Sequence, residues 1–158
     1  MGPAKEIPMD IQARKATLAD LEQLVSFAVA EANEAEGITK THERVRKGIK
    51  AGLCDDSVAI YWVLEKGGAE VIGNVSVVKE WSNWNAGYYW WIQSIYVLPT
   101  FRGRGLMQKL IQTVKQAAIK EKALDLRLYV HNANKRAIRA YRKTGFSDSE
   151  YKIMRLGV

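Results

Sequence analysis

The chain has 158 residues, of which 47% are hydrophobic and 26% charged, and its formal net charge is +7. This composition is typical of one soluble globular domain whose core is large enough to need no disulfide or structural metal. The positive charge favours anionic partners, which include nucleic acid and a polyphosphate-bearing cofactor, and charge alone does not choose between them.

The single cysteine, Cys54, excludes a disulfide framework and favours a reducing, cytoplasmic compartment. It follows an apolar helical stretch, so we expect it to be buried packing rather than a nucleophile. No apolar run approaches the roughly 20 residues that span a bilayer, so no membrane partner is expected. The first residues, MGPAKEIPMD, lack the apolar stretch of a signal peptide and predict a flexible arm over residues 1–10.

The remaining residues, 11–158, contain no linker, repeat or low-complexity tract and are expected to form one domain. Residues 11–16 alternate apolar and polar side chains, as a half-buried strand does. Thr17 followed by Asp20 is a helix-start signal, and the apolar spacing after it predicts a helix that ends near Gly37.

A second amphipathic helix is expected over residues 41–53. The pattern then changes to strands over residues 58–65 and 71–81, joined by a turn at Gly67 and Gly68. Residues 88–97 (YYWWIQSIYV) are almost wholly apolar or aromatic, which is typical of a central strand covered on both faces.

The last third of the chain predicts four more elements: a helix over 105–121, a strand over 124–130, a helix over 134–143 and a closing strand over 151–156. The sequence therefore predicts an α/β domain with a mixed, mostly antiparallel sheet of six or seven strands and about four helices.

A basic, glycine-rich turn joins the central strand to the next helix in residues 97–107, VLPTFRGRGLM. Gly103 and Gly105 permit left-handed dihedrals and a close approach of backbone to a ligand, and the helix start offers unpaired amides to an anion. The stretch lacks both the GxxxxGK of a nucleotide P-loop and the third glycine of a dinucleotide-binding turn. Taken alone, it fits an anion site and a plain surface turn equally well.

A second motif follows in residues 128–146, LYVHNANKRAIRAYRKTGF. Together the two stretches resemble the GCN5-related N-acetyltransferase (GNAT) superfamily. The acetyl-CoA loop of that family has Arg or Gln, two free positions, Gly, one free position and then Gly or Ala. Arg102, Gly105 and Met107 stand at these places, and Met107 departs from the small-residue preference. The second family motif is matched in order and spacing by Asn134, Ala137, Tyr141, Gly145 and Phe146.

The run EWSNWNAGYYWWIQSIYVLPTFRGRG is further similar to a GNAT group with a WIQS-type central strand. The resemblance implies a GNAT fold, acetyl-CoA as cosubstrate and direct transfer of its acetyl group to a primary amine. It implies that the backbones of Tyr96 and Val97 pair with the pantetheine arm and that Asn134 bonds a pantetheine amide. The pyrophosphate would lie on main-chain amides of one loop: Arg102, Gly103, Arg104, Gly105, Leu106 and Met107.

Tyr141 is the implied general acid, because a phenol stays protonated at neutral pH and can donate to the leaving sulfur; core packing is the alternative. The general base stays open. Many family members have a glutamate on the central strand, where this chain has Gln93 and Ser94, and neither of these side chains takes a proton at neutral pH. Glu80 and His131 are the alternatives for a base that acts through water.

The acceptor amine also has several candidate contacts. GNAT acceptor sites are usually walled by the end of the first helix, where three acids could bind a cationic amine or simply be solvated: Glu31, Glu34 and Glu36. Glu80, Gln93, Trp81 and Trp84 are further candidates, and one of Trp90 and Trp91 is expected to be sheet packing. The two histidines lack metal-ligand neighbours, so no metal is expected.

Two other functions stay open. The missing strand glutamate suggests a GNAT-fold protein that binds CoA without catalysis. The charge of +7 and the stretch KRAIRAYRK suggest a nucleic-acid-binding module, although an RNA-recognition aromatic motif and a helix-turn-helix are absent from the sequence. We expect a small-molecule or peptide amine as acceptor and no nucleic acid, and a homodimer is left open because the family commonly dimerises.

Overall fold

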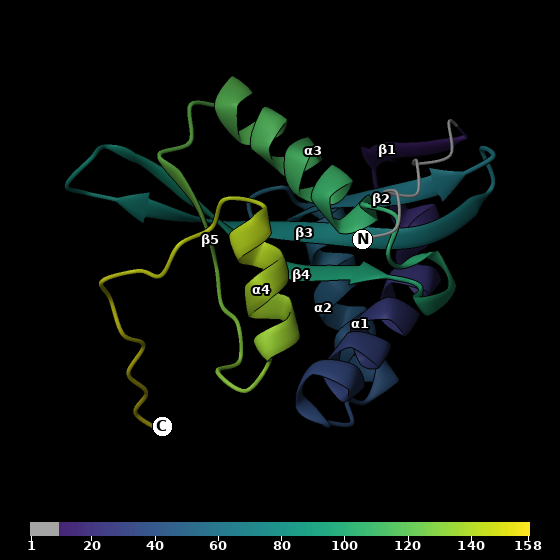
Figure 1. Ribbon diagram of the computed structural model, residues 1–158, viewed down its shortest axis with the longest axis horizontal. Coiled ribbons are helices and arrows are strands. Elements are labelled where there is room, and N and C mark those ends of the chain that lie inside the picture. Colours follow the sequence, from purple (N-terminus) through teal and green to yellow (C-terminus); the bar gives the residue numbers. More distant parts are fainter. Residues whose placement is uncertain (1–9) are drawn as a thin grey trace.

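Five strands form one sheet in chain order, and helices cover both of its faces (Figure 1). The computed structural model describes residues 10–158, so the arm expected over residues 1–10 lies almost wholly outside the described residues. The elements are β1 (Ile11–Lys15), α1 (Leu21–Glu36), α2 (His42–Cys54), β2 (Ile60–Lys66), β3 (Glu70–Ser82), β4 (Gly87–Val97), α3 (Leu106–Lys120), β5 (Asp125–Leu128) and α4 (Lys135–Lys143), with short 3-10 turns η1 (Leu18–Asp20) and η2 (Pro99–Phe101).

The sheet is mixed and mostly antiparallel, as the sequence predicts. β1, β2, β3 and β4 pair antiparallel with their neighbours, and β5 pairs with β4 in parallel. The long β4 lies inside the sheet, between β3 and β5, which confirms its prediction as a central strand.

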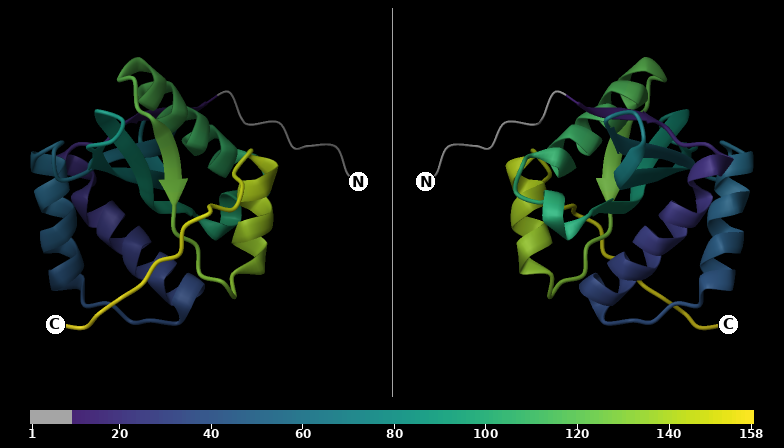
Figure 2. Two further views of the ribbon diagram at one scale, coloured as in Figure 1. Left: turned by 90° about the vertical axis from the view of Figure 1, so that its left-hand side faces the viewer. Right: turned by 90° about the vertical axis from the view of Figure 1, so that its right-hand side faces the viewer.

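The closing strand expected over residues 151–156 is wrong, so the described chain has five strands instead of six or seven. This segment is irregular, and its apolar side chains are exposed, Met154 by 92% and Leu156 by 90%. Alternation of apolar and polar residues predicts a strand only where a neighbouring strand offers backbone partners. The edge strand β5 has four residues, and the C-terminal segment runs away from it (Figure 2).

Each face of the sheet has its own core. α3 and α4 lie on one face and α1 and α2 on the other (Figure 2). The larger cluster, under α3, is built on fully buried side chains such as Leu110, Val114 and Trp90. In the second cluster α2 packs closely on β2, because an added Cβ at Gly52 would lie 2.8 Å from the Tyr61 ring.

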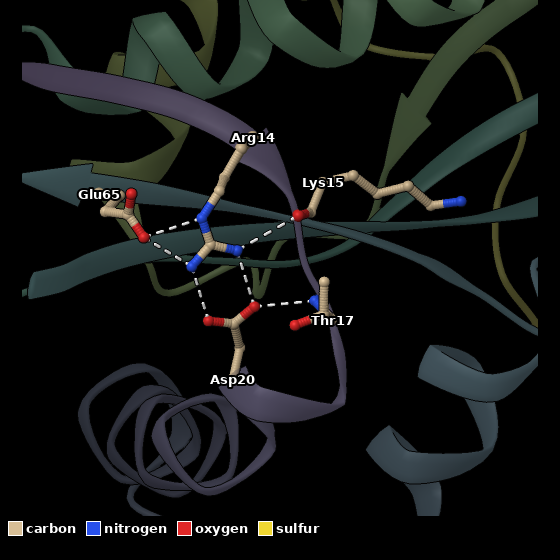
Figure 3. A network of polar contacts seen from close by, with 5 residues as sticks. All are labelled: Arg14, Lys15, Thr17, Asp20 and Glu65. Atoms are coloured by element: carbon tan, nitrogen blue, oxygen red, sulfur yellow. Dashed lines mark hydrogen bonds and ion pairs between the residues drawn. The ribbon is translucent and has the colours of Figure 1, made fainter. Parts of the chain in front are cut away.

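A partly buried ion-pair network holds β1 against β2 and against the start of α1 (Figure 3). Arg14 donates to both carboxylate oxygens of Asp20 at 2.9 Å and to Glu65 at 2.8 Å. The N–H of Thr17 also donates to Asp20, which is 5% exposed. Arg14 holds the pKa of the Asp20 carboxyl below its usual value. Asp20, which the sequence predicts as part of a helix start, therefore does more than cap that helix, since it also binds Arg14 of β1.

Two single-residue expectations have opposite outcomes. Gly37 ends α1 with a φ of +64°, in the left-handed conformation that favours glycine there. Cys54 is exposed at the end of α2, so its prediction as buried packing is wrong. The apolar side chains of α2 that pack in the second cluster include Ile49 and Leu53. Cys54 is the next residue after Leu53 and lies outside this row.

Candidate active site

The sheet opens halfway along β4. β5 pairs with β4 only as far as the pair of Ile92 with Leu128, whereas β4 continues to Val97. Gln93 is an extra residue in β4, between the pairs that Ile92 and Ser94 make with β3. Such a β-bulge bends a strand and is common next to active sites. Beyond the bulge, the outer edge of β4 has no strand partner in residues 10–158.

Glu31 of α1 occupies this open edge. Its carboxylate accepts a hydrogen bond from the N–H of Ile95 at 3.2 Å and one from the Ser94 hydroxyl at 2.5 Å. Burial raises the pKa of the Glu31 carboxyl, and these two hydrogen bonds oppose the rise. A carboxylate with a raised pKa is a better proton acceptor near neutral pH than an ordinary glutamate.

Tyr141 of α4 faces the same region from the other side of the sheet. Its ring packs against the core cluster under α3 and lies 5.9 Å from the Phe146 ring, edge to face. Burial, and secondarily the negative charge of Glu31, raise the pKa of Tyr141 to about 12. The structure therefore brings a carboxylate with a raised pKa within electrostatic reach of a phenol that stays protonated.

The glycine-rich turn has the expected backbone. Gly103 and Gly105 have φ angles of +76° and +75°, and α3 begins directly after them. The amide N–H groups of residues 103–108 carry no hydrogen bond to any part of the described chain. Met107 packs into the core under α3, so its larger side chain points away from these amides.

Arg102 is turned toward α1. Its Nε donates to the Val97 carbonyl at 2.9 Å and its Nη2 donates to Glu34 at 2.7 Å. The Tyr96 hydroxyl also donates to Glu34, at 3.3 Å, and the Arg102 guanidinium lies 5.3 Å from the Tyr96 ring centre. Glu34 is therefore engaged by its own chain, and it joins α1 to the glycine-rich turn.

Asn134 begins α4. Its side-chain oxygen accepts from the Ala137 N–H at 3.1 Å, and its amide NH2 group has no partner among the described residues. His131, expected as a possible base, is exposed, and its Nδ1 accepts from the Ala133 N–H at 3.2 Å. The second family motif thus combines a helix cap with one free amide donor.

A hollow of about 260 Å³ adjoins the bulge, lined by Val78, Glu80, Trp91, Ile92, Gln93 and Tyr129. The Trp91 indole N–H donates to the Glu80 carboxylate at 2.6 Å. The Trp91 ring stacks on Tyr129 with centres 4.4 Å apart. Two candidates from the sequence, Glu80 and Gln93, thus share one hollow.

The other aromatic candidates lie elsewhere. Trp81 and Trp84 are at the tip of the β3–β4 hairpin, 56% and 86% exposed, and the structure does not bring them to the hollow. Trp90 is 1% exposed, which confirms that one of the two adjacent tryptophans is sheet packing. Sequence reasoning missed Tyr129, which follows β5, and the register of β5 against β4 was the signal needed to place it beside Trp91.

In residues 10–158 there is no group of three or more His, Cys, Asp or Glu side chains placed to hold a metal ion. None of the helices in that range is long and apolar enough to cross a membrane.

The model of the acetyltransferase (GNAT) family matches residues 22–146. Thialysine N-epsilon-acetyltransferase of Bos taurus is 34% identical over 84 residues, which are 53% of this chain and 49% of that protein. The chain thus spans about half the length of the curated relatives it matches.

Two solved structures are similar over almost the whole chain. A possible acetyltransferase from Clostridium difficile 630 is 30% identical with a TM-score of 0.88, and the match covers 94% of this chain and 97% of that one. A protein of Clostridium acetobutylicum described as a predicted acetyltransferase, solved with acetyl-CoA, has a TM-score of 0.74 at 20% identity over 92% and 96% of the two chains, and it shares the fold.

Proposed function

Because the chain belongs to the GNAT acetyltransferase family, we propose that it transfers an acetyl group from acetyl-CoA directly to a primary amine. The observation that carries this proposal is that Glu31 accepts from the Ile95 N–H at the open edge of β4, while the Tyr141 phenol on the other face of the sheet is near enough for the charge of Glu31 to raise its pKa. The names of relatives agree with it, since one is a thialysine N-epsilon-acetyltransferase and another was solved with acetyl-CoA.

The donor fits the unpaired groups of the chain. The free amides of residues 103–107, at the start of α3, suit the pyrophosphate. At the open edge of β4 the N–H of Val97 suits an amide of the pantetheine arm, whereas its carbonyl already accepts from Arg102. The Tyr96 backbone faces Asn74 of β3 instead of this edge, because Leu98, two residues on, donates to Ile72 of β3. The free NH2 group of Asn134 adds a donor from α4. Arg104 and Lys109 add positive charge around the loop.

Glu31 is the base in this proposal, and it takes the place of the alternatives Glu80 and His131. An acceptor amine arrives as an ammonium ion and must lose a proton before its nitrogen attacks the thioester carbon. Glu31 is partly buried next to the bulge, whereas the exposed His131 already uses its Nδ1 in a turn. Burial raises the pKa of Glu31, which suits proton acceptance near neutral pH.

The Glu31 carboxylate also holds the backbone N–H of β4 that we expect to bind the thioester of acetyl-CoA. In the structure the N–H of Ile95 is bonded to Glu31. We propose that the thioester carbonyl takes over this N–H, which then stabilises the developing oxyanion. The exchange frees one oxygen of Glu31 to receive the proton of the ammonium ion.

Tyr141 completes the proton balance. The new C–N bond forms as the C–S bond breaks, and the sulfur leaves with the bonding electron pair. The Tyr141 hydroxyl donates its proton to that sulfur, so CoA departs as a neutral thiol. A further proton lost from the amide nitrogen restores the phenol through solvent.

A titration with acetyl-CoA tests the donor site first, by calorimetry and by thermal unfolding. We expect stabilisation of the wild-type chain that rises with acetyl-CoA concentration and is lost in Gly105→Glu, which puts a side chain and a negative charge on the loop. Gly48→Glu is the matched control, because Gly48 is exposed on α2 and an added Cβ there meets nothing within 4 Å. Absence of any stabilisation of the wild-type chain at millimolar acetyl-CoA would overturn the proposal. CoA-thiol release on addition of a primary amine then separates catalysis from binding alone.

A further inference from the structure

On the premise of this acetyl transfer, we propose that the hollow of Glu80, Trp91 and Tyr129 binds a second cationic group of the acceptor. The acceptor class is then an amine that carries another positive charge several methylene groups away from the nitrogen that is acetylated. The proposal rests on the position of the hollow relative to Glu31, on its chemistry, and on the charge left unpaired in it.

The hollow and Glu31 lie on the same face of the sheet. Ser94, which bonds Glu31, pairs with Ser76, and Trp91 pairs with Val78. Ser76 and Val78 are two positions apart on β3, so their side chains share a face and are about 7 Å apart along the strand. Val78 packs against the cluster under α1 and α2, which identifies this face as the one from which Glu31 reaches β4. One acceptor molecule can therefore extend from the base to the hollow.

The walls of the hollow suit an ammonium group. The Glu80 carboxylate is held by the Trp91 indole N–H at 2.6 Å, so it is oriented before any ligand arrives. The stacked rings of Trp91 and Tyr129 form an aromatic wall beside it. A carboxylate next to aromatic rings attracts a cation by both charge and the ring quadrupole.

No ion pair within residues 10–158 neutralises Glu80. Its neighbour Lys79 points to the opposite face, where it lies 4.8 Å from the Trp90 ring centre and pairs with Glu121. Glu80 thus holds a negative charge that is oriented by a neutral donor and left without a cation.

Arg127 of β5 lies on the same face of the sheet, next to the aromatic rings of β4. Its guanidinium lies 3.5 Å from the Tyr89 ring centre, 5.7 Å from that of Trp91, and 3.6 Å from Asp125. The strand face therefore already holds one cation against aromatic rings, on the β5 side. An acceptor whose second group is a carboxylate would bind at Arg127 instead, and a variant of that residue separates the two cases.

The test compares acceptors that differ only in the second charge. Diaminopentane and pentylamine have the same chain length, and their KM values are measured by CoA-thiol release at saturating acetyl-CoA. We expect the KM for diaminopentane to be about tenfold lower than that for pentylamine in the wild-type chain. Glu80→Gln should remove that difference by raising the KM for diaminopentane about tenfold. Glu70→Gln is the matched control, because it removes the same charge from the exposed start of β3.

Calorimetry gives a readout that does not need turnover. Diaminopentane is titrated into protein saturated with CoA, for wild type, Glu80→Gln and Arg127→Gln. Binding that is lost only in Glu80→Gln supports the site, even if no amine is acetylated, in which case the proposed transfer fails and the site stands. Equal KM values for the diamine and the monoamine in an active enzyme would overturn the second-cation site and leave the transfer standing. Tighter binding of 6-aminohexanoate, lost in Arg127→Gln, would also overturn it.

Discussion

Replacing Glu31 by glutamine keeps the shape of the side chain and removes its ability to take a proton. The oxygen of the introduced amide can still accept from the Ile95 N–H, and its NH2 group can donate to the Ser94 hydroxyl, which now acts as an acceptor. The substitution therefore separates the charge of the residue from its packing.

The expected loss of rate follows from the role of a positioned base, which contributes about 10²–10⁴-fold. We expect kcat of Glu31→Gln to fall by about 10²-fold or more, with the affinity for acetyl-CoA little changed. The pH profile is a sharper signature. Since burial raises the pKa of Glu31, wild-type kcat/KM should decline as pH falls toward a value above that of an ordinary glutamate, and the variant should lack this decline.

Glu31→Gln should raise the stability of the folded chain at neutral pH, although it lowers kcat. An acid whose pKa is higher in the folded state binds more protons there, so the free energy of unfolding falls as pH rises between the unfolded and folded pKa values. Above that window the ionised Glu31 is a cost, at about 1.4 kcal/mol for each pKa unit of difference, and a 1 kcal/mol change shifts Tm by about 2–4 °C in a chain of this size. Glu31→Gln should therefore melt higher at pH 7, and the gain should vanish below the ordinary glutamate pKa.

The measurements are stopped assays of thiol release between pH 5 and 9 and thermal unfolding at pH 4 and 7. Glu43→Gln is the control, because it neutralises an exposed acid in the first turn of α2 that does not contribute to the raised pKa of Glu31. A variant that keeps the wild-type rate and the same acid limb would refute the assignment of the base. A lower Tm at pH 7 would show that the hydrogen bonds of the ionised carboxylate outweigh its burial.

Three further changes test other parts of the structure. Tyr141→Phe should lower kcat by about 10²-fold without weakening acetyl-CoA binding, and because burial raises the pKa of Tyr141 to about 12, any loss of wild-type activity between pH 8 and 10 must come from another group. Asp20→Asn should cost about 1–2 kcal/mol at pH 7. Since Arg14 lowers the pKa of Asp20, this contribution exists above the ordinary carboxyl pKa and is lost as pH falls through the lower folded value, so urea midpoints of the two proteins should converge in acid. Leu110→Ala, at a fully buried position, should cost about 2–5 kcal/mol in urea unfolding, and a cost under about 1 kcal/mol would contradict the described core.

Most helices and strands could be predicted from the sequence, because the spacing of apolar residues in each segment matches its burial in the structure. The run YYWWIQSIYV predicted an interior strand, and β4 is one. The segment 151–156 failed because its alternation is a local property, whereas a strand also needs a partner edge. Cys54 failed for a related reason, since it lies one position beyond the buried row of its helix.

The candidate site divides in the same way. The glycine-rich turn was predictable, because positive φ angles at Gly103 and Gly105 are a property of the local chain. The sequence could not distinguish the roles of the three acids at the end of α1. Only the packing of α1 against β4 shows that Glu31 binds the Ile95 N–H whereas Glu34 binds Arg102. The bulge at Gln93 likewise depends on the register between two strands and leaves no mark in one sequence.

Arg102 has a consequence for how the two ligands influence each other. Its side chain joins the glycine-rich turn to the Val97 carbonyl and to Glu34, one helical turn from Glu31. A displacement of that turn on ligand binding would therefore reach α1 through the hydrogen bond from Arg102 to Glu34 and β4 through the one to Val97. Equilibrium linkage makes such an influence reciprocal, so the factor by which CoA changes the affinity for an amine must equal the factor by which the amine changes the affinity for CoA. Arg102→Met should bring that common factor toward one while leaving both individual sites in place.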